Sequence, residues 1–172
     1  MYRAIAWWVR KHGVDDIAAR VQEPELVVGT DPSAPTVVVD GVDVTDAIRS
    51  REVTNLVSTV AAVPEVRTRL VALQRSLIGE GGVVVEGRDI GTTVMPDAEL
   101  KIFLTADADE RARRRSAEGL ATTSSEMSDR DRRDAGRVAS PMKRAEDAVD
   151  LDTTALTLEQ AIDRIVALAN ER

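Results

Sequence analysis

Apolar residues recur every three or four positions in three stretches of the first half of the chain. Residues 2–12 have the pattern of a short amphipathic helix with two tryptophans, and Gly13 is suited to end it. A second helix is predicted over residues 45–63 and a third over residues 65–80, because Pro64 interrupts the helical pattern between them.

Other stretches follow the pattern of strands. In residues 36–45, TVVVDGVDVT, an apolar run meets Asp40-Gly41 and then alternates with polar residues, which is a strong hairpin signal. The continuous apolar runs at residues 83–87 (VVVEG) and 100–106 (LKIFLTA) are typical of strands that are buried in a parallel sheet.

The C-terminal third alternates between helical and strand patterns. A helix is predicted over residues 106–119, a charged helix over residues 130–137 and a short strand within residues 147–154. The last helix begins with a capping box made by Thr157 and Gln160. Helices that alternate with apolar strands indicate an α/β fold with a parallel sheet.

Composition narrows the class of protein. The chain has 172 residues, of which 43% are hydrophobic and 31% charged, so we expect one compact folded domain of ordinary size. It has no cysteine, no apolar run near the roughly 18 residues of a membrane span and no signal-peptide pattern. We therefore expect a cytoplasmic protein. The net charge of −7 argues against broad nucleic-acid binding.

The most unusual placement of charge is the pair Arg88-Asp89, which follows the apolar run and lies between Gly87 and Gly91. In open parallel sheets, ligands bind beyond the carboxyl ends of the strands, and glycines let a ligand approach the backbone closely. The pair is therefore a candidate ligand site. A turn that is held together by an Arg–Asp contact is an equally good interpretation of this segment alone.

Two further clusters contain arginine, the side chain that binds phosphate oxygens in a fork. In the charged helix, Arg130, Asp134 and Arg137 are spaced i, i+4 and i+7 and share one face. A solvated helix with internal ion pairs is the alternative interpretation. Four more arginines lie on one helical turn, where they repel each other unless anions neutralise them; they are Arg111, Arg113, Arg114 and Arg115.

Together these clusters predict a site where several arginines surround a phosphorylated small molecule. Phosphoryl transfer depends on positioning and charge stabilisation more than on a nucleophilic side chain. The absence of cysteine and the presence of only one histidine fit that reaction better than acyl transfer. The histidine, His12, lies near the end of a helix and is given no role.

Several segments resemble one known family over nearly the whole chain. EGRDIGTTVMPDAELKIFLTADADERARRR resembles the central signature of the bacterial cytidylate kinases, and RDRRDAGRVASPMKRAEDAVDLDTT resembles their C-terminal segment. MYRA and the segment VDGVDVTDAIRSREVTNLVSTVAAVPEVRTRLVALQR also resemble that family in the same order. The resemblance implies a monomeric enzyme that transfers the γ-phosphate of ATP to CMP or dCMP with Mg²⁺.

The resemblance also implies an architecture: an α/β fold of the P-loop nucleoside monophosphate kinase type, with a parallel sheet flanked by helices. Residues 1–20 and 51–172 would form the core domain, with a lid around residues 116–129. Residues 21–50 would form a small insert that contains β-strands and binds CMP.

Site residues follow where the family's motif positions match this sequence. Asp89 matches the residue that reads the amino edge of cytosine, Ser58 lies against the base, and Asp134 holds the sugar hydroxyls. The other matching positions are arginines: Arg3, Arg67 and Arg88 around the CMP phosphate and base, Arg130 and Arg137 as catalytic residues at the phosphates, and Arg111 and Arg115 beside ATP. No protein ligand for a metal is assigned.

One family feature is missing from the sequence. The family's catalytic loop has the pattern G-x-x-x-x-G-K-S/T, and none of the three lysines here follows a glycine. We therefore expect an N-terminally truncated form that lacks the first strand and the phosphate loop and has weak or no activity. A non-catalytic CMP-binding module and an unstable fragment are the alternatives, and an RNA-binding protein is disfavoured by the net charge.

Overall fold

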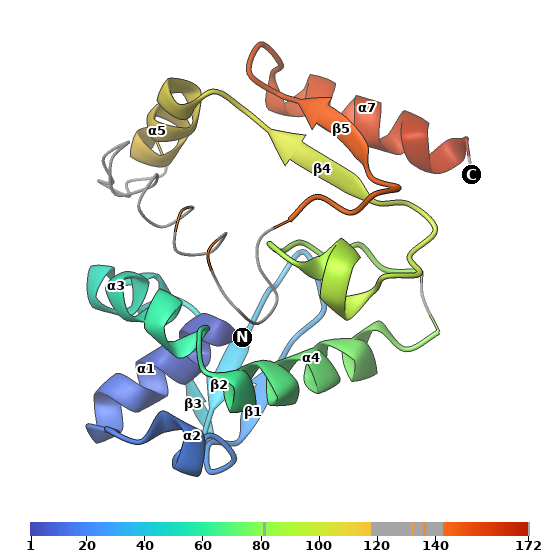
Figure 1. Ribbon diagram of the computed structural model, residues 1–172. Coiled ribbons are helices and arrows are strands. Elements are labelled where there is room, and N and C mark those ends of the chain that lie inside the picture. The colour runs from blue at the N-terminus through green and yellow to red at the C-terminus, as the bar shows by residue number, and fades with distance from the viewer. Residues whose placement is uncertain (81, 118–131, 133–135, 137–142, 172) are drawn as a thin grey trace. The chain divides into compact units, whose positions relative to one another are not determined.

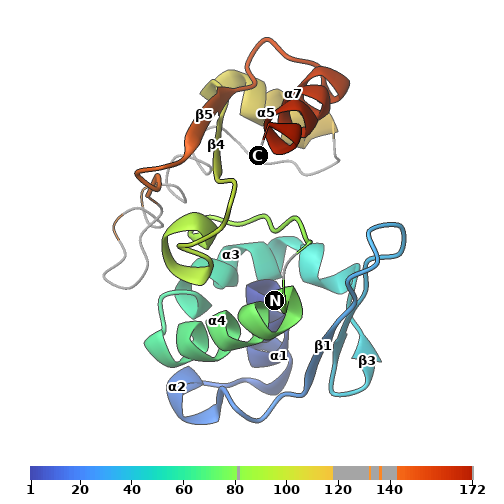
Figure 2. The same ribbon diagram turned by 90° about the vertical axis from the view of Figure 1, so that its right-hand side faces the viewer.

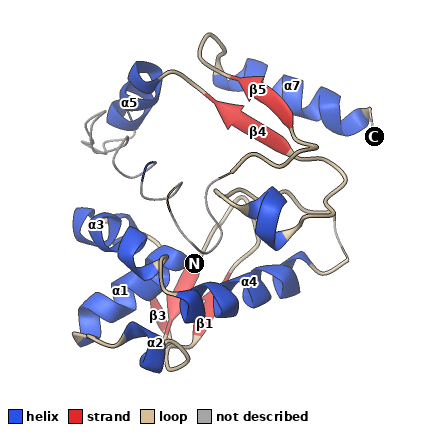
Figure 3. Cartoon of the chain, in the orientation of Figure 1, coloured by secondary structure: helices blue, strands red, loops and turns tan. Residues whose placement is uncertain are grey.

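The computed structural model describes residues 1–80, 82–117, 132, 136 and 143–171. The chain divides into two compact units, Met1–Val84 and Val85–Arg172. Each is described by itself below and can be followed in Figure 1, with helices and strands distinguished by colour in Figure 3.

Three long helices, one short helix and a small antiparallel sheet build the first unit. Helix α1 (Tyr2–His12) packs against α3 (Arg51–Val60), while α4 (Pro64–Ile78) follows α3 after a short turn. As predicted, α1 ends at Gly13, which adopts the left-handed conformation with φ of 58°. A short helix, α2 (Ile17–Arg20), leads to the sheet and contacts α4.

The predicted hairpin is confirmed. Strands β2 (Val37–Val39) and β3 (Val42–Asp43) pair antiparallel around Asp40-Gly41, and both turn residues have positive φ. Strand β1 (Leu26–Val28) pairs antiparallel with β2 on its other edge, and Figure 2 shows these strands together at one side of the unit.

The helix predicted over residues 45–63 is broken in two. A single 3₁₀ turn, η1 (Ala47–Arg49), comes first, and α3 starts after Ser50. The backbone of Ser50 is extended, with ψ of 156°, and its side chain accepts a hydrogen bond from Val53 N. An N-cap residue has non-helical dihedral angles. Because Ser50 is the N-cap of α3, one continuous helix cannot run through residue 50.

The core of the first unit is mainly aliphatic, as the low aromatic content requires, and it also contains the buried side chain of Trp8. Side chains from α1, the sheet, α3 and α4 meet in it; among the most deeply buried are Ile5, Val39, Val44, Val53, Val60, Val66 and Leu70.

In the second unit, β4 (Ile102–Thr105) pairs with β5 (Val149–Asp152) in parallel, which confirms these two predicted strands. Helix α5 (Ala108–Ala117) follows β4, and α7 (Leu158–Asn170) follows β5 behind the predicted capping box of Thr157 and Gln160. Figures 1 and 2 show α5 and α7 on the same side of the two strands. One face of α7 is exposed and apolar, with Leu158, Ile162 and Val166 at helical spacing.

The strand predicted at residues 83–87 is wrong. These residues have no strand conformation, and Val84 is 98% exposed. A parallel strand forms only where a neighbouring strand supplies hydrogen-bond partners for its backbone. Within the described part of the chain, β4 and β5 pair only with each other, so residues 83–87 lack such a neighbour there. The apolar pattern therefore identified residues that are suited to a strand without forming one.

Two further properties concern the described residues only. None of their helices is both long and apolar enough to cross a bilayer. They also contain no group of three or more histidine, aspartate or glutamate side chains arranged to hold a metal ion.

Candidate functional site

Helix α3 brings together three of the predicted site residues in the first unit. The NH1 nitrogen of Arg3, on α1, donates to Ile48 O at 3.0 Å and to Thr54 Oγ1 at 2.8 Å. Ser58 lies one turn after Thr54 on the same face of α3 and is buried, with 7% of its surface exposed. Arg67 approaches from α4 and donates from NH1 to Ala61 O at 3.2 Å, at the C-terminal end of α3.

Arg67 is the most buried charged side chain of this group, with 4% of its surface exposed. Its guanidinium carbon lies 5.4 Å from the centre of the Tyr2 ring, within the range of a cation–π contact. A buried guanidinium is costly unless polar or aromatic groups compensate for its lost hydration. Tyr2 and the carbonyl of Ala61 do so on the protein side, and the arrangement holds the arginine in one place.

Asp89 and Arg88 lie at the start of the second unit, before a single π-helical turn, η2 (Ile90–Val94). Asp89 is buried, with 9% exposed, and its backbone carbonyl accepts from Thr93 N at 2.9 Å. Short π-helical turns recur at functional sites because they redirect the side chains around them. Arg88 is half-buried.

Local packing explains why residue 87, next to this pair, is a glycine. A Cβ atom on Gly87 would lie 2.6 Å from Cγ1 of Ile90, which is far too close. The sequence suggested that Gly87 leaves room for a ligand. The structure instead shows that its missing side chain leaves room for Ile90, so Gly87 gives no support to either interpretation of the Arg88-Asp89 pair.

The arginine cluster of α5 is neutralised in part by its own helix. Glu110 bonds to both Arg113 and Arg114 at 2.7 Å, and these bonds lower the pKa of its carboxyl from 4.5 to about 2. Arg113 and Arg114 therefore share one counter-ion on their own helix. Arg111 is half-buried on the same helix, and Arg115 lies in its last turns.

Arg114 forms hydrogen bonds at the carboxyl ends of the two parallel strands. Its NH1 donates to Thr153 Oγ1 at 2.9 Å and its NH2 donates to Thr153 O at 2.6 Å, directly after β5. Thr153 in turn donates from Oγ1 to Thr105 O at 3.0 Å, at the end of β4. These bonds fix the loop at the edge of the sheet where ligands of parallel sheets usually bind.

Three predicted residues lie outside the described part of the chain: Arg130, Asp134 and Arg137. The structure therefore does not test the face that they were predicted to share. The predicted lid around residues 116–129 lies almost wholly outside the described residues as well.

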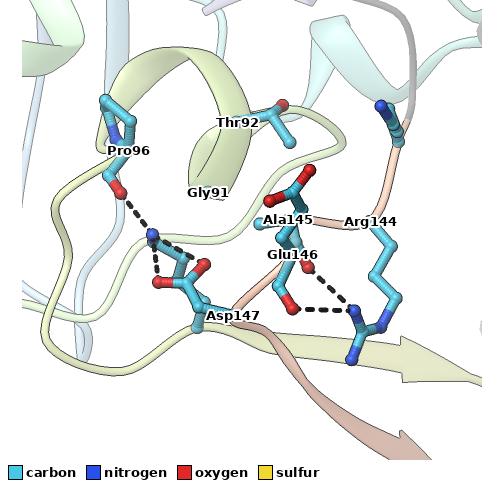
Figure 4. Close-up of a pocket in the computed structure, with 9 residues that line it drawn as sticks. Gly91, Thr92, Pro96, Arg144, Ala145, Glu146 and Asp147 are labelled. Carbon is cyan, nitrogen blue, oxygen red and sulfur yellow. Dashed lines mark hydrogen bonds and ion pairs between the residues drawn. The ribbon is translucent and has the colours of Figure 1, made fainter.

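An open pocket of about 320 Å³ lies elsewhere in the second unit (Figure 4). Two of its three cations have protein partners: Lys101 bonds to Asp147 at 2.6 Å, and Arg144 bonds to Asp150 at 2.7 Å. Arg144 also donates to the carbonyls of Ala145 and Glu146. The pocket lies where β4 and β5 begin, at the edge opposite to their carboxyl ends, and none of the predicted site residues lines it. It is therefore a poor candidate for the functional site.

Arg3, Ser58 and Arg67, with the side chains that hold the two arginines, are called the α3 site below. The sequence analysis did not identify two of these side chains, Thr54 and Tyr2. Thr54 accepts the hydrogen bond from Arg3, and Tyr2 lies against Arg67. Thr54 could have been found from its position one helical turn before Ser58. Tyr2 gave no comparable signal, because its contact joins residues that are far apart in the sequence.

Comparisons with known proteins identify the family. The family model described as cytidylate kinase matches residues 1–171. The chain is 53% identical to a cytidylate kinase of Streptomyces avermitilis, over 99% of this chain and 79% of the relative. It is 54% identical to one of Streptomyces griseus, over 97% and 77%, and 45% identical to one of a Geobacillus species, over 100% and 83%. The chain therefore belongs to the cytidylate kinase family of nucleoside monophosphate kinases.

Proposed function

We propose that this protein binds CMP or dCMP as phosphate acceptor and takes part in transfer of the γ-phosphate of ATP to it. The observation that carries the proposal is the convergence of Arg3, Ser58 and Arg67 on helix α3. Two arginines held by backbone carbonyls and a buried serine are suited to an anionic, polar ligand such as a nucleoside monophosphate.

Arg3 and Arg67 are proposed to hold the phosphate and base of CMP. Each guanidinium is oriented before any ligand binds, Arg3 by Ile48 O and Thr54, and Arg67 by Ala61 O and Tyr2. Such preorganisation lowers the entropy cost of binding. Ser58 is proposed to contact the base from the same helix.

Asp89 is proposed to select cytosine, with Arg88 beside it to hold the nucleotide. A carboxylate accepts a hydrogen bond from the exocyclic amino group of cytosine, whereas uracil presents a carbonyl at that position. The burial of Asp89 favours this role. Placing an acceptor such as the uracil carbonyl opposite a buried carboxylate costs more free energy than placing it opposite an exposed one.

We propose that these 172 residues bind ATP, the phosphate donor, only weakly. They contain no G-x-x-x-x-G-K-S/T sequence, whose backbone N–H groups and lysine would bind the ATP phosphates. Arg111 and Arg115 are proposed to lie beside ATP, Arg130 and Arg137 at the transferred phosphate, and Asp134 at the sugar hydroxyls of CMP. We therefore expect slow turnover by this chain.

Magnesium is proposed to enter with the ATP phosphates. In phosphotransferases it usually keeps several waters and takes only one or two carboxylates from the protein. The described residues contain no group of three or more histidine, aspartate or glutamate side chains arranged to hold a metal ion, and the magnesium is proposed to bind through the nucleotide.

Calorimetry with CMP, UMP and ATP, together with a coupled assay of ADP release, tests the proposal. We expect CMP to bind, UMP to bind much more weakly, and ADP release to be slow. Asp89→Asn should weaken CMP binding and narrow the preference for CMP over UMP, because the amide can donate to the uracil carbonyl. Normal turnover by this chain would refute the weak donor side.

The same titrations separate the other two candidate functions. Binding of CMP with no binding of ATP and no turnover would favour a non-catalytic CMP-binding module. Failure to bind either nucleotide, combined with the absence of a cooperative thermal transition, would favour an unstable fragment.

A further inference from the structure

One contact of the α3 site has a role that the family resemblance does not assign. Arg3 uses both hydrogens of its NH1 nitrogen within the protein, one for Ile48 O at 3.0 Å and one for Thr54 Oγ1 at 2.8 Å. Because a guanidinium is planar, two fixed bonds at one nitrogen fix the directions of its other N–H groups.

The hydroxyl of Thr54 is itself held in one orientation. Arginine is only a donor, so Thr54 Oγ1 must accept from Arg3, and its own hydrogen is available to another acceptor. That acceptor is Ser50 O, 2.8 Å away and one turn earlier on the same side of the helix. The chain of bonds from Ser50 O through Thr54 to Arg3 therefore has a single direction.

Thr54 is also rigid and well placed. Its β-branched side chain has few rotamers in a helix, and it is half-buried between α1 and α3. It lies one turn before Ser58, so the residue that orients Arg3 and the predicted base-contacting serine share one face of α3.

We infer that Thr54 is a positioning residue for CMP binding, which acts by fixing the guanidinium of Arg3 on the face of α3 that carries Ser58. This inference rests on the proposed function, since it assigns Thr54 a role only if Arg3 meets CMP. Thr54 itself need not touch the nucleotide.

The test compares Thr54→Val with two matched variants in the full 172-residue chain. Valine keeps the shape of threonine and removes the hydroxyl, so Arg3 loses this acceptor while its bond to Ile48 O can remain. Thr54→Ser restores the hydroxyl. Thr59→Val makes the same chemical change at an exposed position of the same helix. Affinity for CMP is measured by calorimetry, and folding is checked by the urea midpoint of each variant.

We expect Thr54→Val to weaken CMP binding about tenfold, as loss of one hydrogen bond to a charged group predicts. Thr54→Ser should recover most of the affinity, and Thr59→Val should leave it unchanged. In an Arg3→Met background, Thr54→Val should have no further effect on CMP affinity, because the group that it positions is gone.

The possible outcomes separate the two proposals. If the unsubstituted chain binds no CMP, the proposed function fails and this inference fails with it. If the unsubstituted chain binds CMP and Thr54→Val binds it equally well, only the role of Thr54 is overturned. An equal loss in the Arg3→Met background would also overturn it, because the threonine would then act without Arg3.

Discussion

Replacing Val84 by alanine tests the finding that residues 83–87 do not form a packed strand. The substitution removes two carbon atoms, and each buried methylene contributes about 0.8 kcal/mol. Val39, which is fully buried in β2 of the same unit, should therefore lose about 2 kcal/mol on replacement by alanine, including a small cavity term. Val84 is 98% exposed, so Val84→Ala should change the free energy of unfolding by less than about 0.5 kcal/mol.

Urea unfolding followed by tryptophan fluorescence measures both variants. The only tryptophans of the chain, Trp7 and Trp8, lie on α1, and Trp8 is buried in the core of the first unit. The fluorescence signal thus reports on the unit that contains both valines. If Val84→Ala were as destabilising as Val39→Ala, residues 83–87 would be packed as the apolar pattern suggested, which would refute their assignment as an exposed, non-strand segment.

Three further substitutions test other contacts of the fold. Asp40→Ala should lower the free energy of unfolding in urea by about 3 kcal/mol, because it removes the acceptor for Trp8 Nε1 and Glu25 N and leaves alanine at a φ of 50°. Asp40→Gly should lower it by about 1 kcal/mol less, because glycine adopts positive φ without strain. Equal losses for the two variants would exclude a contribution from backbone strain. Thr157→Ala should remove about 1 kcal/mol of stability by breaking the capping box of α7, seen as a lower urea midpoint by circular dichroism, and no change would show that the box contributes nothing. Glu110→Gln tests a pH effect: because its folded-state pKa is lowered to about 2, the carboxylate stabilises the protein above its ordinary pKa of 4.5 and loses that effect as the pH falls towards 2. The variant should therefore lose less stability than the unsubstituted chain between pH 5 and about 2.5, and identical pH profiles would contradict the assignment.

Elements that depend on local chemistry could be predicted from the sequence. The turn at Asp40-Gly41, the end of α1 at Gly13 and the cap at Thr157 each depend on a few neighbouring residues, and the structure has all three. The strand at residues 83–87 depends instead on a partner elsewhere in the chain, and its own composition could not reveal whether that partner is present.

The same distinction between local and long-range features applies to the candidate site. The family resemblance gave Arg3, Ser58 and Arg67, whereas their physical grouping around α3 depends on contacts across 6 to 51 residues. The only sequence signal for Thr54 was its position one helical turn before Ser58, since its bond to Arg3 joins residues that are far apart in the sequence. In α5, two of the four clustered arginines, Arg113 and Arg114, share a counter-ion on their own helix, Glu110, whereas the roles of Arg111 and Arg115 beside ATP stay a prediction.

The α3 site is part of the fold as well as a candidate for binding. Arg3 and Arg67 bond to backbone carbonyls that end or precede α3, so their replacement should disturb the packing of α1, α3 and α4 together with any ligand contact. A loss of CMP affinity in an Arg67 variant would therefore not separate binding from folding. Thr54 is more informative, because valine preserves its shape and removes only its hydroxyl, which accepts from Arg3 and donates to Ser50 O. If the site is preorganised as proposed, Thr54→Val should lower CMP affinity under conditions where every variant is folded, and this loss should disappear in the Arg3→Met background. A loss of the same size in that background would mean that the contact serves the fold alone.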